Sequence, residues 1–209
     1  MSDSTPSDPA PLYRKTDHWF QRATATLLGD VPCRLGCTSC CIGPFPITLL
    51  DVQTLQQGLA GLPPDHRRRI EQRAIEQAVA MEAAFPQLAK TTLIDDWSDR
   101  DIDRLVTEFH HHPCPALDAD GRCGVYAHRP LVCRSMGIPT DDRGLAHGAC
   151  EIQTFIPIVR LPAAFREEEH RLAQEEAASL DRLRQTTGST GEEVFLPYGF
   201  LQRGADEKV

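Results

Sequence analysis

The chain has 209 residues, of which 41% are hydrophobic and 25% are charged, as in ordinary globular proteins. Its formal net charge of −8 disfavours contact with nucleic-acid phosphates, so we expect no nucleic-acid partner. No apolar run approaches the about 20 residues that span a bilayer, and the N-terminal segment lacks the basic and apolar regions of a secretory signal. These absences predict a cytoplasmic protein without membrane contact.

The N-terminal part of the chain predicts a tail, a helix and a loop. Residues 1–12 are rich in Ser, Asp and Pro, which predicts a disordered tail. The spacing of apolar residues over Tyr13–Leu28 predicts an amphipathic helix. The next segment, CRLGCTSCCIGP, is interrupted by Gly and Pro, so we expect an irregular backbone around its four cysteines.

Two helices are predicted in the middle of the chain. Thr48 and Asp51 fit a capping box, which starts a helix that ends near Gly61. A longer helix is predicted over residues 65–84 and should bury one apolar stripe, formed by Ile70, Ala74, Ile75, Ala78 and Met81.

Three further helices are predicted in the second half. A second capping box, Ser98 with Asp101, starts a helix before the stretch HHHPCP. A short helix is predicted over residues 129–136, where a proline occupies the first turn, and a long charged helix over residues 162–185.

Almost every predicted element is a helix, so we expect a mainly α fold. It should be a single domain over residues 13–200, with helices around a loop-rich cysteine metal site whose motif core spans residues 30–152. The stretch EEVFLPYGFL, residues 192–201, predicts a short strand or an apolar tail over the core. Residues 201–209 should form a flexible C-terminus.

Eight cysteines are the main chemical signal of the chain. Disulfides are not expected in a reducing compartment, and soft thiolates favour zinc or an iron–sulfur cluster. Eight cysteines are enough for two centres of four ligands each, or for one centre with spare thiols. The candidate metal ligands are Cys33, Cys37, Cys40, Cys41, Cys114, Cys123, Cys133 and Cys150.

The spacing of the first cysteines favours iron over zinc. Structural zinc sites usually show paired C-x2-C knuckles, and this chain has a single C-x2-C step. Its C-x3-C-x2-C triple has the spacing with which radical S-adenosylmethionine enzymes hold a [4Fe-4S] cluster. The chain lacks the aromatic residue before the third cysteine and the β/α repeats of that class, so we reject that enzyme class. The adjacent Cys40 and Cys41 should face different directions.

A larger part of the chain resembles one family. The segment CPALDADGRCGVYAHRPLVCRSMG, residues 114–137, together with CRLGCTSCC, residues 33–41, resembles the YkgJ-type cysteine-cluster family, whose members are expected to chelate zinc or iron. The resemblance spans about residues 30–152. One departure is the opening C-x3-C, where many members of the family have C-x2-C.

The resemblance implies a metal-binding protein that holds one or two cysteine-ligated centres. The flagellin lysine methylases have a similar cysteine pattern and are thought to carry an iron–sulfur cluster, so a [4Fe-4S] cluster is favoured, with zinc as the alternative. Two other functions stay open: an iron–sulfur-dependent oxidoreductase or protein-modifying enzyme, and a zinc-stabilised module that docks a protein partner. Nothing in the sequence identifies a catalytic residue, a substrate or that partner.

Several polar residues near the cysteines are candidates for supporting roles. The resemblance implies one of two roles for three side chains: packing beside the cofactor, or hydrogen-bonding its sulfurs. These side chains are Tyr126, Arg129 and Arg134. We expect His110, His111, His112 and His128 to be solvated, and His147, three residues before Cys150, is a slightly better ligand candidate than these. Asp95, Asp96, Asp118 and Asp120 fit caps and turns better than a hard-metal site.

Overall fold

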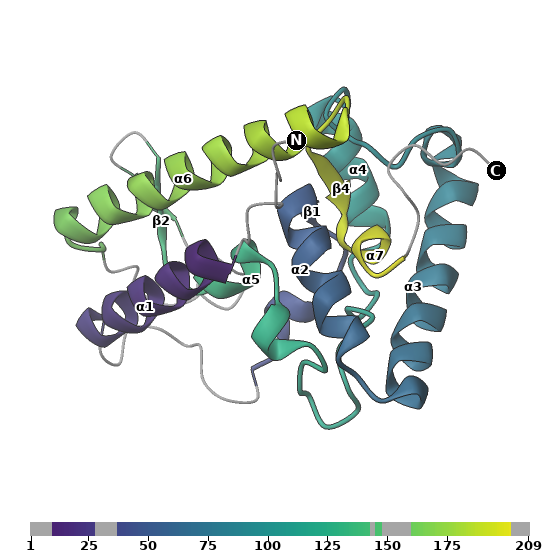
Figure 1. The fold of residues 1–209 in the computed structure, drawn as a ribbon, viewed down its shortest axis with the longest axis horizontal. Helices are drawn as coiled ribbons and strands as arrows, with labels where there is room; N and C mark the ends of the chain where they lie inside the picture. Colours follow the sequence, from purple (N-terminus) through teal and green to yellow (C-terminus); the bar gives the residue numbers. More distant parts are fainter. Residues whose placement is uncertain (1–9, 28–36, 143–144, 148–159, 202–209) are drawn as a thin grey trace, which may run out of the picture. The chain divides into compact units, whose positions relative to one another are not determined.

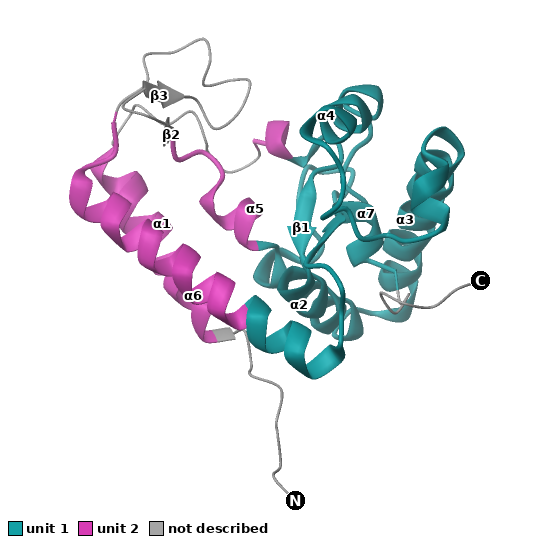
Figure 2. Ribbon diagram, turned by 90° about the horizontal axis from the view of Figure 1, so that it is seen from above, with its two compact units in different colours: residues 1–6, 41–130, 180–209 teal, residues 7–40, 131–179 magenta. Residues whose placement is uncertain are grey.

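The computed structural model describes residues 10–27, 37–142, 145–147 and 160–201 (Figure 1). These residues are mainly helical, which confirms the predicted fold class. Contacts divide the chain into two compact units that interleave in sequence (Figure 2). Unit 1 comprises residues 1–6, 41–130 and 180–209, and unit 2 comprises residues 7–40 and 131–179.

Unit 1 contains most of the predicted helices of the middle of the chain, and a short strand pair. Its elements are β1 (Pro46–Thr48), α2 (Leu49–Ala60), α3 (Pro64–Ala84), η2 (Pro86–Ala89), α4 (Asp99–Glu108), η3 (Tyr126–His128), β4 (Glu193–Phe195) and α7 (Leu196–Gly199). The 3-10 turn η1 (Ser39–Cys41) lies where the two units meet in sequence.

Unit 2 contains the predicted first helix and the short helix that carries Cys133. Its elements are α1 (Ala10–Thr26), α5 (Leu131–Ser135), the strand pair β2 (Thr140–Asp142) and β3 (Leu145–His147), and the first part of α6 (Ala163–Thr187). Helix α1 begins at Ala10, earlier than predicted, and Leu12 at its start is buried. Residues 1–9 of the predicted tail lie outside the described residues, as do residues 202–209 of the predicted C-terminus, whereas Leu201 is buried.

Both predicted helix starts are capped by the expected residues, and the first forms a full capping box. At the start of α2, the backbone N–H of Asp51 donates to the Thr48 hydroxyl (3.4 Å), and the N–H of Thr48 donates back to the Asp51 carboxylate (3.3 Å). At the start of α4, the N–H of Asp101 donates to the Ser98 hydroxyl (3.2 Å), which itself donates to the Asp101 carboxylate. Each cap satisfies backbone groups that a helix end leaves without partners.

The core of unit 1 combines the apolar stripe of α3 with an aromatic cluster. Four of the five predicted stripe residues are buried, but Ile75 is 42% exposed, because the stripe of α3 is narrower than the sequence spacing indicates. The Trp97 ring lies 5.9 Å from the Phe85 ring and 5.6 Å from the Phe195 ring, measured between centroids. The aromatic pairs therefore join the end of α3 to the C-terminal strand.

The C-terminal apolar stretch forms a strand followed by a short helix. Strand β4 pairs antiparallel with β1, in the register Pro46↔Phe195, Ile47↔Val194 and Thr48↔Glu193. The prediction of a strand near the end of the chain is thus confirmed, whereas its partner β1 was not predicted. Helix α7 is buried and packs closely on β1 and α2: a Cβ at Gly199 would lie 2.6 Å from Ile47 of β1 and 2.9 Å from Leu55 of α2.

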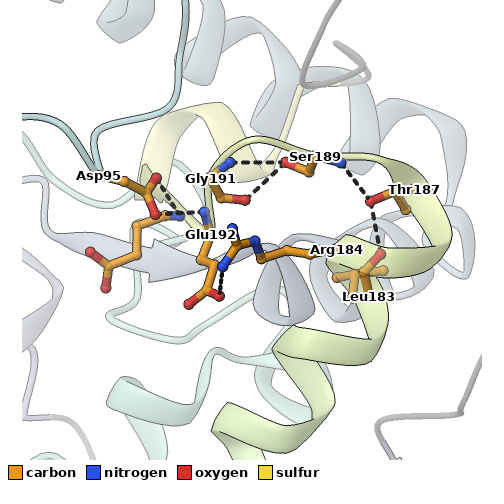
Figure 3. A network of polar contacts seen from close by, with 8 residues as sticks. Asp95, Leu183, Arg184, Thr187, Ser189, Gly191 and Glu192 are labelled. Carbon is orange, nitrogen blue, oxygen red and sulfur yellow. Dashed lines mark hydrogen bonds and ion pairs between the residues drawn. The ribbon is translucent and has the colours of Figure 1, made fainter.

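Asp95 anchors the segment that leads into β4 (Figure 3). Its carboxylate accepts hydrogen bonds from the backbone N–H groups of Glu192 (2.7 Å) and Glu193 (3.2 Å). The Glu192 side chain in turn pairs with Arg184 at 2.9 Å. Asp95 therefore has the structural role of a cap, as predicted, and holds the C-terminal strand in place.

The core of unit 2 lies between α1 and α6. The buried side chains of this core are Trp19, Ala23, Leu27, Ile138 and Leu161, with Phe20, Phe165 and Leu172 packed against them. The Trp19 indole N–H donates to the carbonyl oxygen of Phe165 (2.9 Å), so the two helices are joined by both apolar and polar contacts. None of the helices in the described part of the chain combines the length and apolar character needed to cross a membrane.

Candidate metal centre

The described residues contain six of the eight predicted cysteine ligands. All six are thiols of intermediate exposure. Cys41, Cys114 and Cys123 belong to unit 1, and Cys37, Cys40 and Cys133 to unit 2. The remaining two, Cys33 and Cys150, lie outside the described residues.

Backbone pairing brings the two halves of the cysteine motif together at Cys41 and Cys114. The N–H of Cys114 donates to the carbonyl oxygen of Cys41 (2.7 Å), and the N–H of Gly43 donates to the carbonyl oxygen of His112 (2.7 Å). An antiparallel bridge between Ile42 and Pro113 lies between these two bonds. Gly43 has a φ of +87°, a conformation that glycine adopts without steric cost.

Cys114 and Cys123 stand at the two ends of a tight hairpin. The bridge Leu117↔Cys123 and the hydrogen bond from Gly124 N–H to the Ala116 carbonyl oxygen (2.8 Å) join its two sides. The predicted turn at DADG is confirmed: Gly121 donates to the Asp118 carbonyl oxygen (3.0 Å), with a φ of +78°. Cys123 therefore lies on the second side of the hairpin, directly opposite Leu117.

Helix α3 holds this hairpin through three polar side chains. Arg73 Nη1 donates to the carbonyl oxygens of Leu117 (2.8 Å) and Pro115 (3.4 Å). Gln77 Nε2 donates to the Pro113 carbonyl oxygen (2.7 Å), and the His66 ring lies 3.2 Å from the Asp118 carboxylate. These supporting residues were not predicted from the sequence. The only signal is their spacing, because His66, Arg73 and Gln77 fall on one face of a helix.

The surroundings of Cys123 act on its ionisation in opposite directions. Burial, the largest effect, raises the pKa of the Cys123 thiol, whereas the Val125 backbone N–H and the Arg129 charge lower it, and the Asp118 carboxylate raises it. Arg129 therefore favours the thiolate, although less strongly than burial disfavours it. A metal ion must displace the proton of this thiol to bind it.

Arg129 and Tyr126 form a pair beside this hairpin. The guanidinium carbon of Arg129 lies 4.0 Å from the centroid of the Tyr126 ring, and Arg129 Nη1 donates to the Tyr126 carbonyl oxygen (3.3 Å). The Tyr126 side chain is 64% exposed. The proposed contact of either side chain with cofactor sulfurs stays a prediction, but the effect of Arg129 on Cys123 is consistent with it.

Arg134 follows Cys133 on α5 and is buried, with 3% of its side chain exposed. Its guanidinium forms an ion pair with Asp17 of α1 and lies 5.1 Å from the centroid of the Tyr13 ring. The sequence predicts a contact between Arg134 and the cofactor, and does not predict this pairing with α1.

The histidines differ in exposure. His110 and His111 are exposed, as predicted. His112 is half-buried, and burial followed by the neighbouring His111 charge lowers the pKa of its imidazole. His128, which is predicted to face solvent, is half-buried: its side chain packs against Gly58 of α2, because the missing Cβ leaves room for it. The side chain of His147 lies outside the described residues.

The described residues do not by themselves form a complete ligand set. Within them, no three Cys, His, Asp or Glu side chains are grouped closely enough to hold a metal ion. The donor chemistry nevertheless fits a soft metal or an iron–sulfur cluster, because the motif supplies thiols, and two of its segments are joined at Cys41 and Cys114.

Comparison with known proteins identifies the motif. A model of the family CxxCxxCC, described as "Putative zinc- or iron-chelating domain", matches residues 32–151. No curated protein and no solved structure matches the chain. The matched region covers more than half of the sequence and contains all eight cysteines. The chain therefore belongs to the CxxCxxCC family, in agreement with the resemblance carried by its cysteines, and this membership supports metal binding.

Proposed function

We propose that the chain binds one or two inorganic centres through the thiolates of its cysteine motif, and that the metal is iron in a [4Fe-4S] cluster in preference to zinc. The observation that carries the proposal is the backbone bond between Cys114 and Cys41, because it joins the two halves of the motif that the family model spans. The C-x3-C-x2-C spacing of Cys33, Cys37 and Cys40 supports the choice of iron.

The chemistry of the thiols explains why a metal belongs there. Several neighbouring thiolates repel one another, and coordination removes this cost, since the metal replaces their protons and neutralises much of their charge. Four thiolates around a [4Fe-4S] core leave a net charge of about −2. Arg129, whose charge already favours the Cys123 thiolate, is placed to compensate part of it.

Metal binding should also stabilise the fold. The Cys41–Cys114 pairing closes a long segment that includes α2, α3 and α4, and closing such a segment costs conformational entropy. Ligand bonds at both ends of the segment offset this cost. We expect removal of the metal to lower the free energy of unfolding by several kcal/mol.

The test is purification of the full chain without oxygen, followed by quantification of iron, zinc and acid-labile sulfide. Iron and sulfide in equal amounts, about four of each per cluster, together with a brown colour, would support the proposal. A colourless protein with stoichiometric zinc would reject the iron assignment and keep the metal-binding function. A protein with neither metal would reject both.

Cysteine variants identify the ligands in the same assay. We expect Cys37→Ser and Cys123→Ser to lose the metal, and Cys41→Ser to lose part of it, because adjacent Cys40 and Cys41 cannot both point at one centre. Ser39→Ala is the matched control, since Ser39 lies in the same turn and is exposed. Full metal content in Cys123→Ser would reject that ligand.

A further inference from the structure

Arg134 is a buried cation placed directly after the candidate ligand Cys133. Only 3% of its side chain is exposed, and its guanidinium pairs with the Asp17 carboxylate and lies over the Tyr13 ring. Removal of a guanidinium from water costs several kcal/mol unless other groups compensate the charge. Asp17 and Tyr13 provide this compensation, and both belong to α1, where their i,i+4 spacing puts them on one face.

The contact with α1 determines how α5 is oriented. Helix α5 has five residues, too few to be stable alone. Leu131 packs against Leu12 and Tyr13 of α1, and Arg134, three residues later, lies on the same face of α5. Consecutive side chains of a helix point about 100° apart. With Leu131 and Arg134 both held by α1, the rotation of α5 about its axis is set, and with it the direction of Cys133.

Helix α1 is itself firmly held within unit 2. Trp19 donates to the Phe165 carbonyl oxygen (2.9 Å), and Lys15 pairs with Glu175 at 2.7 Å, so that α1 is attached to α6 at two points on either side of Asp17. The Asp17 carboxylate is therefore a well-defined partner for Arg134.

We propose that Asp17, acting through Arg134, is a positioning residue for the Cys133 thiolate in the metal centre. This inference rests on the proposed function. It adds α1 to the functional unit, although α1 ends before residue 32, where the match to the family begins. The role is orientation: an apolar pair of similar size would stabilise a buried contact as well as an ion pair does, but it would fix a direction less strictly.

The test measures the affinity of the reduced, metal-free full chain for Zn²⁺, in competition with a chromophoric chelator. We expect Asp17→Asn to weaken Zn²⁺ binding about 10- to 100-fold, the range found when groups that orient metal ligands are removed. Asp17→Glu, which keeps the charge, should restore much of it. Arg14→Gln is the matched control, because it removes an exposed charge from the same helix and should leave the affinity unchanged.

A second variant separates orientation from stability. In the double variant Asp17→Leu with Arg134→Met, apolar packing replaces the ion pair, so the metal-free protein should melt near the wild-type temperature while its Zn²⁺ affinity still falls. Wild-type affinity in a folded Asp17→Asn or in the double variant would overturn the inference and leave the proposed function intact. A wild type that binds no Zn²⁺ and carries neither iron nor zinc when purified without oxygen would overturn both.

Discussion

The backbone N–H of Cys114 donates to the carbonyl oxygen of Cys41 across 2.7 Å, although α2, α3 and α4 separate the two residues in sequence. This bond is flanked by a bridge between Ile42 and Pro113, so the contact is a short antiparallel ladder. The cysteine-rich opening of the motif and its second half are therefore joined at the level of the backbone. Side chains that support this junction should influence metal binding without contacting the metal.

Arg73 is the first such side chain. Arg73→Ala removes the donor to the Leu117 and Pro115 carbonyl oxygens, which should lower the free energy of unfolding by about 1–3 kcal/mol and loosen the hairpin between Cys114 and Cys123. Chemical denaturation and Zn²⁺ titration measure the two effects. Arg69→Ala, at an exposed position four residues earlier, is the control and should change neither. Equal behaviour of the two variants would contradict the role of Arg73.

The ionisation of Cys123 predicts how metal binding depends on pH. Because burial raises the pKa of this thiol, its proton is still bound at neutral pH, and the metal must displace it. Apparent Zn²⁺ affinity should therefore rise with pH between about 6.5 and 8.5, with release of protons measurable by calorimetry in buffers of different ionisation enthalpy.

Arg129→Gln tests the electrostatic part of this explanation. Loss of the Arg129 charge should raise the pKa of Cys123 further, and should weaken Zn²⁺ binding at neutral pH by up to about tenfold. Arg122→Gln removes a charge from the same hairpin whose side chain is 82% exposed and pairs with Asp120, so it should have little effect. A larger effect from Arg122 would refute the assignment to Arg129.

Loss of the negative charge of Glu193 should stabilise the fold at neutral pH. Burial, followed by the charges of Asp95 and Glu192, raises the pKa of its carboxyl, so the native state holds the proton more tightly than the unfolded chain does. The ionised carboxylate therefore destabilises the fold at neutral pH. Glu193→Gln should raise the free energy of unfolding at neutral pH, by less than about 1 kcal/mol because the side chain is partly exposed.

The gain from Glu193→Gln should disappear as the pH falls below about 4.3, the pKa of an unperturbed glutamate, because both states of the wild type are then protonated. Urea unfolding of the wild type and of Glu193→Gln, at neutral pH and below about pH 4.3, measures this gain. Glu108→Gln, at an exposed position of α4, is the control and should show no such pH-dependent gain. A gain of equal size at both pH values would exclude the electrostatic cause.

At Gly58 we expect alanine to destabilise the fold, in contrast to its usual effect inside a helix. Alanine in place of an interior helix glycine usually stabilises by up to about 1 kcal/mol, but a Cβ at Gly58 would lie 2.7 Å from the His128 Cβ. Gly58→Ala should therefore lower the free energy of unfolding, by about 1–3 kcal/mol. In Gly61→Ala the nearest contact is 3.5 Å, so that variant should be tolerated. Thermal unfolding of both variants tests this prediction. Equal melting temperatures would contradict the close contact between Gly58 and His128.

Features that depend on near neighbours along the chain can be predicted from the order of the residues alone. Helix α2 was predicted because Thr48 and Asp51 cap each other over three residues, and the turn at Gly121 because few other residues adopt its φ. The thiol chemistry of the motif was likewise predictable from residue type, since soft ligands favour soft metals. These inferences need no knowledge of the tertiary structure.

Contacts between residues that lie far apart in sequence could not be predicted without the fold. Strand β1 is three residues long, and its pairing with β4 has no local signal. The same holds for Arg73, which was indistinguishable from other exposed helix arginines until the hairpin was seen to pack on α3, and for Arg134, whose burial depends on Asp17 of α1. A side chain's role in such contacts is set by what the fold brings against it, and local spacing does not encode that neighbour.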